Sequence, residues 1–295
     1  MAANLVRRMI LPSVLAAALA AVLLAAAPTA RAYEVTFTDP VGDDHGPGTY
    51  VYPLDPVFAD GVFDIVRFTA REVGSKVRFE VEIAGELSDP WGSGAGFSLQ
   101  NIDIYIDTDG VSGSGATWSL ERRNVDFSPG SAWEYCVWCA PPFDDFTSQV
   151  VDKNGNSSSS GVAVSCDGAT DVITIDVPKS TIGTPTSSWK YLVLMLSQSG
   201  YDAGRVRSVV KDAGQWILGG GDDSQWDSNV IDLVAQAGVN QEALLANYDA
   251  ATGVRAVLIN RADAVAPQIS HTAPASWEAH LPLEVAAEIT DDVVV

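Results

Sequence analysis

Positively charged side chains are scarce in this sequence. It has 17 Lys and Arg residues against 38 Asp and Glu residues, which gives a formal net charge of −21. A surface this acidic repels nucleic acid phosphates and anionic lipids, so we expect no nucleic acid partner. The same carboxylates are potential oxygen ligands for hard cations, although a solvated acidic coat accounts for most of them.

Histidine is almost as rare, and this limits the catalytic chemistry that the chain can perform. There are three histidines, His45, His271 and His280, so most histidine-based mechanisms are excluded. The sequence also lacks a Gly-x-Ser-x-Gly elbow, a His-Glu-x-x-His motif and a phosphate-binding loop. Among 38 acids a chance pair is always available, so their number does not indicate glycoside hydrolysis. We therefore expect a chain that is not an enzyme, with any catalytic domain elsewhere in a longer protein.

Only three cysteines are present, Cys136, Cys139 and Cys166. In an oxidising compartment at least one disulfide is expected, with one thiol left over. If residues 133–139 form a strand, Cys136 and Cys139 point to opposite faces, which favours Cys139–Cys166 or Cys136–Cys166 without deciding between them. A single Cys-x-x-Cys is weak evidence for zinc.

Long apolar runs are confined to the N-terminus. Arg7 and Arg8 precede an apolar run over residues 9–27, which Ala30-Arg31-Ala32 follows. A basic head, an apolar middle and an A-x-A site are typical of a signal peptide, here residues 1–32. The alternative is a retained membrane anchor, but the run is Ala-rich and followed at once by Pro28. We predict a secreted or cell-surface protein with no membrane insertion after signal cleavage.

The mature chain shows the period-2 pattern of short, half-buried strands. Alternating β-branched and aromatic residues recur between turn residues, which predicts an all-β antiparallel sandwich over residues 33–264. One short helix is expected near residues 240–248, capped by Asn240. The expected strands are 34–38, 63–70, 76–83, 99–107, 133–139, 161–166, 172–177 and 189–197.

In the expected strand 99–107, isoleucines alternate with polar residues. The isoleucine face should pack in the core, and the polar face could contribute to a ligand or ion site or simply face solvent. The polar face carries Asn101, Asp103, Tyr105 and Asp107. Asp107-Thr108-Asp109-Gly110 begins like a calcium loop, but the Glu that completes an EF-hand is missing, so a hairpin turn is favoured.

Residues 39–53 pack acids, glycines and prolines into one loop that no regular element can accommodate. Its carboxylates could converge on a cation, or the aspartates could cap the turns of an ordinary Ω-type loop. For a metal site we expect calcium, with ligands drawn from this loop, the Phe63-Asp64-Ile65 strand start and the central strand. The expected ligands are Asp39, Asp43, Asp44, Asp64 and Asp103.

Three separated blocks resemble one known family. They are the loop 39–53 with Phe58–Ile65, then Asp89–Gly92 with Gly96–Asp107, and then Asn229–Leu233 with Gln241 and Tyr248-Asp249. Together they resemble the glucodextranase-like C-terminal module, a branch of the DOMON-like β-sandwiches, over about residues 33–260. The resemblance implies an immunoglobulin-like sandwich that binds carbohydrate or acts at the cell surface, commonly with structural calcium.

On this basis we expect a non-catalytic module whose partner is a polysaccharide or cell-surface glycan, for example an α-glucan. Aromatic rings can stack on sugar rings while amides and carboxylates bond hydroxyls, and the candidate ligand-binding residues are Trp91, Gln100, Tyr105 and Asp107. The alternative is a structural or adhesion module without sugar affinity. Haem ligation by Met195 and His45, as in another DOMON branch, is disfavoured because Met195 lies in an apolar run typical of a buried strand.

The residue pattern of the sequence changes after Pro267. Residues 269–292 resemble the opening strands of a bacterial immunoglobulin-like domain. About thirty residues cannot complete a sandwich of about seven strands. We therefore expect residues 265–295 to be the truncated start of such a domain.

Overall fold

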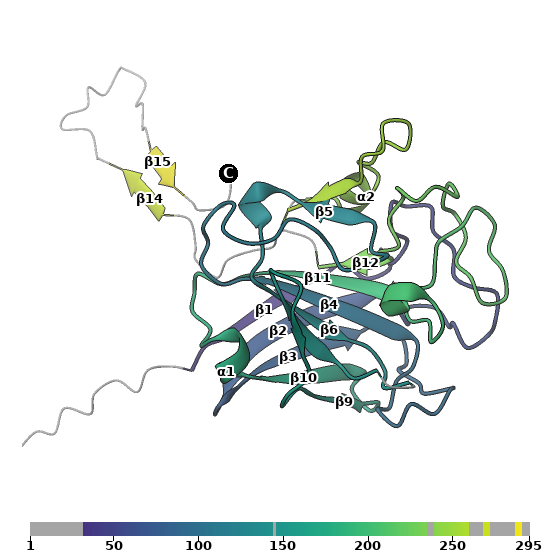
Figure 1. The fold of residues 1–295 in the computed structure, drawn as a ribbon, viewed down its shortest axis with the longest axis horizontal. Coiled ribbons are helices and arrows are strands. Elements are labelled where there is room, and N and C mark those ends of the chain that lie inside the picture. The colour runs from purple at the N-terminus through teal and green to yellow at the C-terminus, as the bar shows by residue number, and fades with distance from the viewer. Residues whose placement is uncertain (1–31, 144–145, 235–238, 260–267, 272–286, 291–295) are drawn as a thin grey trace, which may run out of the picture. The chain divides into compact units, whose positions relative to one another are not determined.

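The computed structural model describes residues 32–143, 146–234, 239–259, 268–271 and 287–290. Two antiparallel sheets form a β-sandwich (Figure 1), which confirms the predicted fold class. The five-stranded sheet consists, in spatial order, of β1 (Glu34–Thr38), β2 (Ile65–Val73), β3 (Lys76–Ile83), β10 (Val172–Pro178) and β9 (Ala163–Asp167). The six-stranded sheet consists of β12 (Asp232–Leu233), β11 (Lys190–Ser197), β4 (Gln100–Asp107), β6 (Tyr135–Cys139), β7 (Gln149–Asp152) and β8 (Ser157–Ser158).

The strongly alternating segments form strands where the sequence predicts them. β1 and β3 begin and end at the predicted residues, and the other six expected strands differ by only a few residues at their ends. Helix α2 (Gln241–Leu245) is shorter than expected, but Asn240 caps it as predicted, its side chain accepting the Ala243 N–H at 3.0 Å. The other helical segments are α1 (Lys179–Ile182) and two 3-10 turns, Pro129–Ser131 and Ala203–Arg205.

Alternate residues of both sheets meet in the main core. In β3, Val77, Phe79, Val81 and Ile83 are buried while the residues between them are partly exposed. Phe79 stacks on a second ring, Phe68, with ring centroids 6.1 Å apart. Burying such side chains contributes about 1.5–3 kcal/mol each. Met195 lies in this core, as its apolar run predicts.

A second hydrophobic cluster covers the outer face of the six-stranded sheet. It is built on Tyr105 of β4 and Leu194 of β11, and the loops between β4 and β6 and the chain after β12 contribute Trp133 and Leu245 to it. Two short strands, β5 (Val125–Phe127) and β13 (Ala256–Leu258), pair in parallel within this layer. All eight residues of β4 are therefore buried. The prediction that one face of this strand could face solvent is wrong, because segments distant in sequence cover it.

The predicted disulfide is also absent, and all three cysteines are free thiols. Cys136 and Cys139 point to opposite faces of β6, as expected, because one belongs to the outer cluster and the other to the main core. Cys166 lies on β9, at the edge of the other sheet. The three thiols therefore come from three separate environments.

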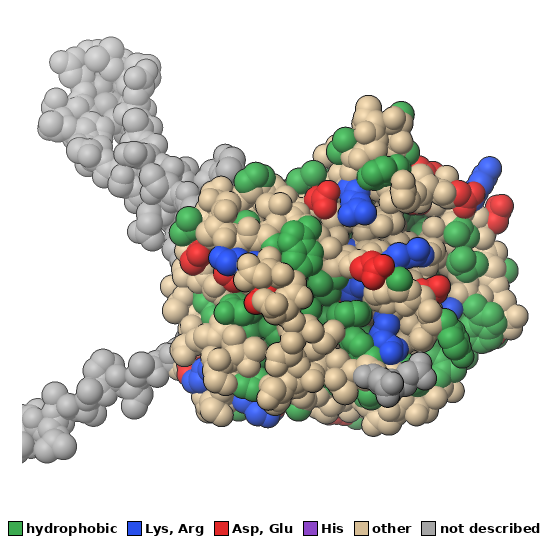
Figure 2. Space-filling view, in the orientation of Figure 1, with side chains coloured by type: hydrophobic (Ala, Val, Ile, Leu, Met, Phe, Trp, Pro, Cys, Tyr) green, Lys and Arg blue, Asp and Glu red, His purple; other side chains and the backbone are tan. Residues whose placement is uncertain are grey.

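The tail contains one antiparallel pair, β14 (Gln268–His271) and β15 (Ala287–Thr290). The rest of the predicted immunoglobulin-like segment lies outside the described residues, as does the predicted signal peptide apart from Ala32. Among the described helices, none is long and apolar enough to cross a membrane. On the face shown in Figure 2, the Lys and Arg side chains of the described residues are scattered among Asp and Glu and form no continuous basic surface.

Candidate functional site

Four aspartates from three segments of the chain converge beside one end of the main core. Asp39 follows β1, Asp43 lies in the loop that follows, Asp64 directly precedes β2, and Asp232 begins β12. Single carboxylate oxygens of Asp39, Asp43 and Asp232 lie within 4.8 Å of one another. We call these four residues the carboxylate cluster.

Backbone pairing determines the position of Asp232. Because β12 pairs with β11 so that Asp232 lies opposite the core residue Met195, its side chain points toward the five-stranded sheet. There it accepts the N–H of Ile65 at 2.6 Å, at the first residue of β2. This hydrogen bond joins the two sheets at the base of the cluster.

The loop and the short helix complete the cluster. The turn at Gly42, whose φ is +85°, brings its N–H to Asp64 Oδ2 at 2.6 Å. Gln241 of α2 donates from Nε2 to the carbonyl oxygen of Asp43 at 2.5 Å and accepts the N–H of Leu233 on Oε1 at 2.8 Å. One glutamine side chain therefore connects the loop, the helix and β12 around the carboxylates.

Three of the four carboxylates lack a cationic partner within the part of the chain that the structure describes. Among the described residues, no Lys or Arg forms an ion pair with Asp43, Asp64 or Asp232. Asp43 Oδ1 and Asp64 Oδ1 are buried, and neither has a hydrogen-bond partner among the described residues. Buried polar atoms in folded proteins nearly always have a partner, so these two oxygens require an explanation.

The pKa values show the cost of placing these charges together. Burial, reinforced by the neighbouring acids Asp44 and Asp43, raises the pKa of Asp64 to about 6. Burial also raises the pKa of Asp43 above its usual value and that of Asp232 well above it, and nearby aspartates add to both shifts. Burial and like charges both disfavour the ionised form. A bound divalent cation would relieve both effects.

Asp44, a further predicted ligand, lies next to the cluster but is bound elsewhere. It is buried, and one carboxylate oxygen accepts the hydroxyl proton of Tyr52. Its other oxygen lies 4.0 Å from His45 Nε2, whose side chain is about half exposed. Asp44 therefore adds negative potential to the loop while its carboxylate is already engaged.

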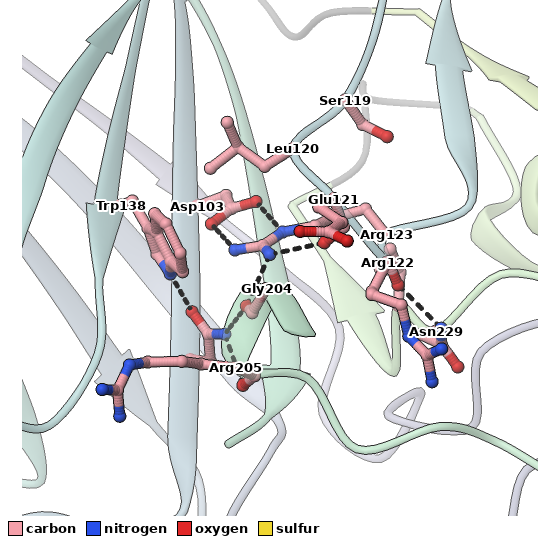
Figure 3. Close-up of polar contacts among 12 residues, drawn as sticks. Asp103, Ser119, Leu120, Glu121, Arg122, Arg123, Trp138, Gly204, Arg205 and Asn229 are labelled. Carbon is pink, nitrogen blue, oxygen red and sulfur yellow. Dashed lines mark hydrogen bonds and ion pairs between the residues drawn. The ribbon is translucent and has the colours of Figure 1, made fainter. Parts of the chain in front are cut away.

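Asp103, the last predicted metal ligand, lies on the opposite face of the six-stranded sheet. Its carboxylate forms a bidentate ion pair with Arg123, at 2.7 and 2.8 Å, and both side chains are fully buried (Figure 3). Arg123 also donates to the carbonyl oxygens of Glu121 and Gly204. The expectation that Asp103 converges with the loop aspartates is wrong, because β4 directs its polar face toward the outer cluster.

Neighbouring polar groups complete this network. Trp138 Nε1 donates to Asn101, whose amide donates in turn to the carbonyl oxygens of Gly204 and Arg205 (Figure 3). The guanidinium of Arg123 also lies 4.9 Å from the Trp138 ring centroid. The contacts of Arg123 and Asn101 are thus internal, which favours a structural role.

The four predicted ligand-binding residues also lie in different environments. Gln100 and Tyr105 are buried and their donors are already used inside the protein, the first bonding the carbonyl oxygen of Val62 and the second Asp103, which favours structural roles. Asp107 caps the turn after β4 by accepting the N–H groups of Asp109 and Gly110, as expected for a hairpin turn. Trp91 alone is half exposed, beside Phe58 and Trp216.

Asp107 also belongs to a second acidic group. One oxygen from each of Asp107, Asp109 and Glu134 lies within 4.8 Å of the others. Local donors bind these carboxylates, and Ser114 and Lys153 approach Glu134 at 3.0 and 3.8 Å. This group therefore has a cationic neighbour, Lys153, whereas Asp43, Asp64 and Asp232 have none among the described residues.

Sequence reasoning missed Asp232, Gln241 and Arg123. Asp232 and Gln241 lie in the third block of the family resemblance, so the signal for them was present, but their approach to the loop depends on the pairing of β12 with β11. Arg123 lies in a segment without any recognisable pattern.

A family model described as the C-terminal binding module, SLH-like, of glucodextranase matches residues 35–260. The match spans both sheets of the sandwich, the carboxylate cluster and helix α2. No curated protein matches the chain.

Proposed function

Because the chain belongs to the family of SLH-like C-terminal binding modules of glucodextranase, we propose that it is an exported, non-catalytic module that binds a polysaccharide and is stabilised by calcium. The observation that carries the binding role is the family match over the whole sandwich. The name glucodextranase makes an α-glucan the first ligand class to test. The module would bring a neighbouring activity, or a cell surface, to its polymer.

The carboxylate cluster supports the calcium part of the proposal. All its side-chain donors are oxygens, the set that calcium prefers, and flexible loop geometry suits its variable coordination better than the strict octahedron of magnesium. Asp39, Asp43, Asp64 and Asp232 would be the ligands. The ion would join the ends of β1 and β12 to the start of β2.

A melting experiment tests the metal. Calcium added to the EDTA-treated protein should raise the melting temperature, because an ion that binds only the folded state stabilises it by about 2.7 kcal/mol at a hundredfold excess over Kd. Asp232→Asn should lose this response, whereas Asp60→Asn, which changes an exposed aspartate of the same segment, should keep it. An identical melting temperature with EDTA and with calcium would contradict the calcium proposal.

Affinity electrophoresis tests the polysaccharide. The purified protein should migrate more slowly in gels that contain soluble starch or dextran than in gels without polymer. A protein that responds to calcium but is not retarded by any polysaccharide would instead be a structural or adhesion module.

A further inference from the structure

An open pocket at one end of the sandwich is lined mainly by aromatic rings. Its volume is about 560 Å³, which lies in the range of small-molecule sites. The lining residues come from the β3–β4 connection, the segment before β7 and the long segment after β11. They are Trp91, Phe143, Gln198, Gly200, Tyr201, Arg207 and Trp216.

Two large rings are exposed at this pocket. Trp216 is 42% exposed and Tyr201 is 100% exposed. Trp216 is nonetheless held in place, with its ring centroid 6.1 Å from that of Phe58 and 6.3 Å from that of Trp91. The turn that carries it is fixed by backbone hydrogen bonds from Leu54 and Asp55 to Gly214 and Gln215. An exposed aromatic surface on a rigid support is suited to stacking on a flat ligand.

Arg207 stiffens the aromatic wall from inside. Its guanidinium carbon lies 5.3 Å from the Trp91 ring centroid and 5.4 Å from that of Phe58. One terminal nitrogen donates to the carbonyl oxygen of Trp216 at 2.6 Å. The Nε–H of Arg207 is buried and has no hydrogen-bond partner in the described part of the chain.

A second donor in the pocket lacks a partner. Gln198 lines the pocket although the residue is only 1% exposed, and its Nε2 forms no hydrogen bond to any residue that the structure describes. A buried donor without an acceptor destabilises the folded protein. Two such donors beside exposed rings therefore define a site that needs a ligand with an apolar face and oxygen acceptors.

A pyranose ring has both properties, since its C–H face is apolar and its edge carries hydroxyl and ring oxygens. We propose that this pocket is a sugar-binding site in which Trp216 and Tyr201 stack on the ring of a polysaccharide unit. Gln198 Nε2 and Arg207 Nε donate to its oxygens. A purely apolar ligand would leave both donors without acceptors. This assignment rests on the proposed function and specifies where the polysaccharide binds.

The test compares pocket variants with a tryptophan outside it. Affinities for soluble starch and dextran would be measured by affinity electrophoresis on the full chain. Trp216→Ala should weaken binding at least tenfold, and Tyr201→Ala about threefold or more, as expected for loss of an aromatic contact. Trp118→Ala, which removes a ring that is 39% exposed outside the pocket, should bind like the wild type.

Gln198→Leu isolates the polar contribution, because it keeps the approximate volume and removes the donor. Its binding should weaken, whereas its melting temperature should stay the same or rise, since an unpaired buried amide is lost. If the wild type is retarded and Trp216→Ala and Tyr201→Ala are retarded equally, the pocket assignment is wrong and the binding function stands. If the wild type is not retarded by any polysaccharide, both are wrong.

Discussion

Two buried aspartates of the six-stranded sheet, Asp103 and Asp232, point to opposite faces and differ in how their charge is balanced. Asp103 points into the outer cluster and is paired with Arg123 at 2.7 and 2.8 Å. Asp232 points toward the other sheet and meets further aspartates, with no Lys or Arg partner among the described residues. Asp103 has an internal counter-cation, and the group around Asp232 has the composition of a site for an external one. An aspartate's function thus depends on the face of the strand that carries it.

The largest expected effect is the loss of the internal cation. Arg123→Met should lower the free energy of unfolding by about 3–5 kcal/mol, because it leaves the Asp103 carboxylate buried without a partner. Urea denaturation monitored by tryptophan fluorescence measures this. The control is Arg71→Met, which breaks a partly exposed pair with Glu80 and should cost only about 0–1 kcal/mol. Equal losses of unfolding free energy in the two variants would show that the buried Asp103–Arg123 pair matters no more for stability than a partly exposed pair.

Removal of a charged group should have the opposite effect on stability in the carboxylate cluster. Without metal, Asp232→Asn should unfold at the same or a higher temperature than the wild type, since it removes a buried charge surrounded by like charges. With calcium it should be less stable than the wild type by about 2–3 kcal/mol. Asp103→Asn, by contrast, should be destabilised to the same extent with and without calcium. If Asp232→Asn were destabilised in EDTA, the Asp232 carboxylate would stabilise the protein without metal, as the Asp103 carboxylate does.

The pH dependence sharpens the comparison further. The folded-state pKa of Asp64 is about 6, above the value of about 3.9 in an unfolded chain. In that window the folded state binds more protons than the unfolded state, so the metal-free protein should lose stability as the pH rises from about 4 to about 6. Calcium bound to the cluster would hold the carboxylates ionised and should remove or reverse this slope. Melting curves in EDTA and in calcium test it, and Asp64→Asn should show a shallower slope in EDTA.

The smallest effect is expected at the second acidic group. Asp109 is exposed and its carboxylate accepts hydrogen bonds from Val111 and Ser114. Asp109→Asn should therefore change stability by no more than about 0.5 kcal/mol and leave the calcium response intact. If Asp109→Asn abolished the calcium response, the proposed calcium site would have to be assigned to this group instead of the carboxylate cluster.

Much of the sandwich could be predicted because its strands carry the information locally. In β3, the alternation alone identifies which residues are buried, and Asn240 marks the N-terminus of α2 as its capping residue. The short strands β5, β7, β8, β12 and β13 were missed, because segments of two to four residues hold too little periodicity and depend on their partners for pairing.

The candidate site was predicted in part for the same reason. Asp39, Asp43 and Asp64 lie within one acidic stretch, and Trp91 lies in a recognisable block. Asp232 and Trp216 join them only through pairing across the fold, from almost two hundred residues away in the case of Asp39 and Asp232. Tyr105 looks like an exposed polar residue of an alternating strand until the layer over that strand is known.

By itself, the sequence determined the all-β class, most strand positions, the acidity and the family, because strand period, charge and ordered motifs are properties of neighbouring residues. Only the tertiary structure decided which aspartates share a site and which are neutralised by an arginine, and that the three thiols stay apart. It also decided that an exposed tryptophan and two unpaired donors line one pocket. These properties depend on which distant segments come into contact, and the free energy of packing the whole chain selects those contacts.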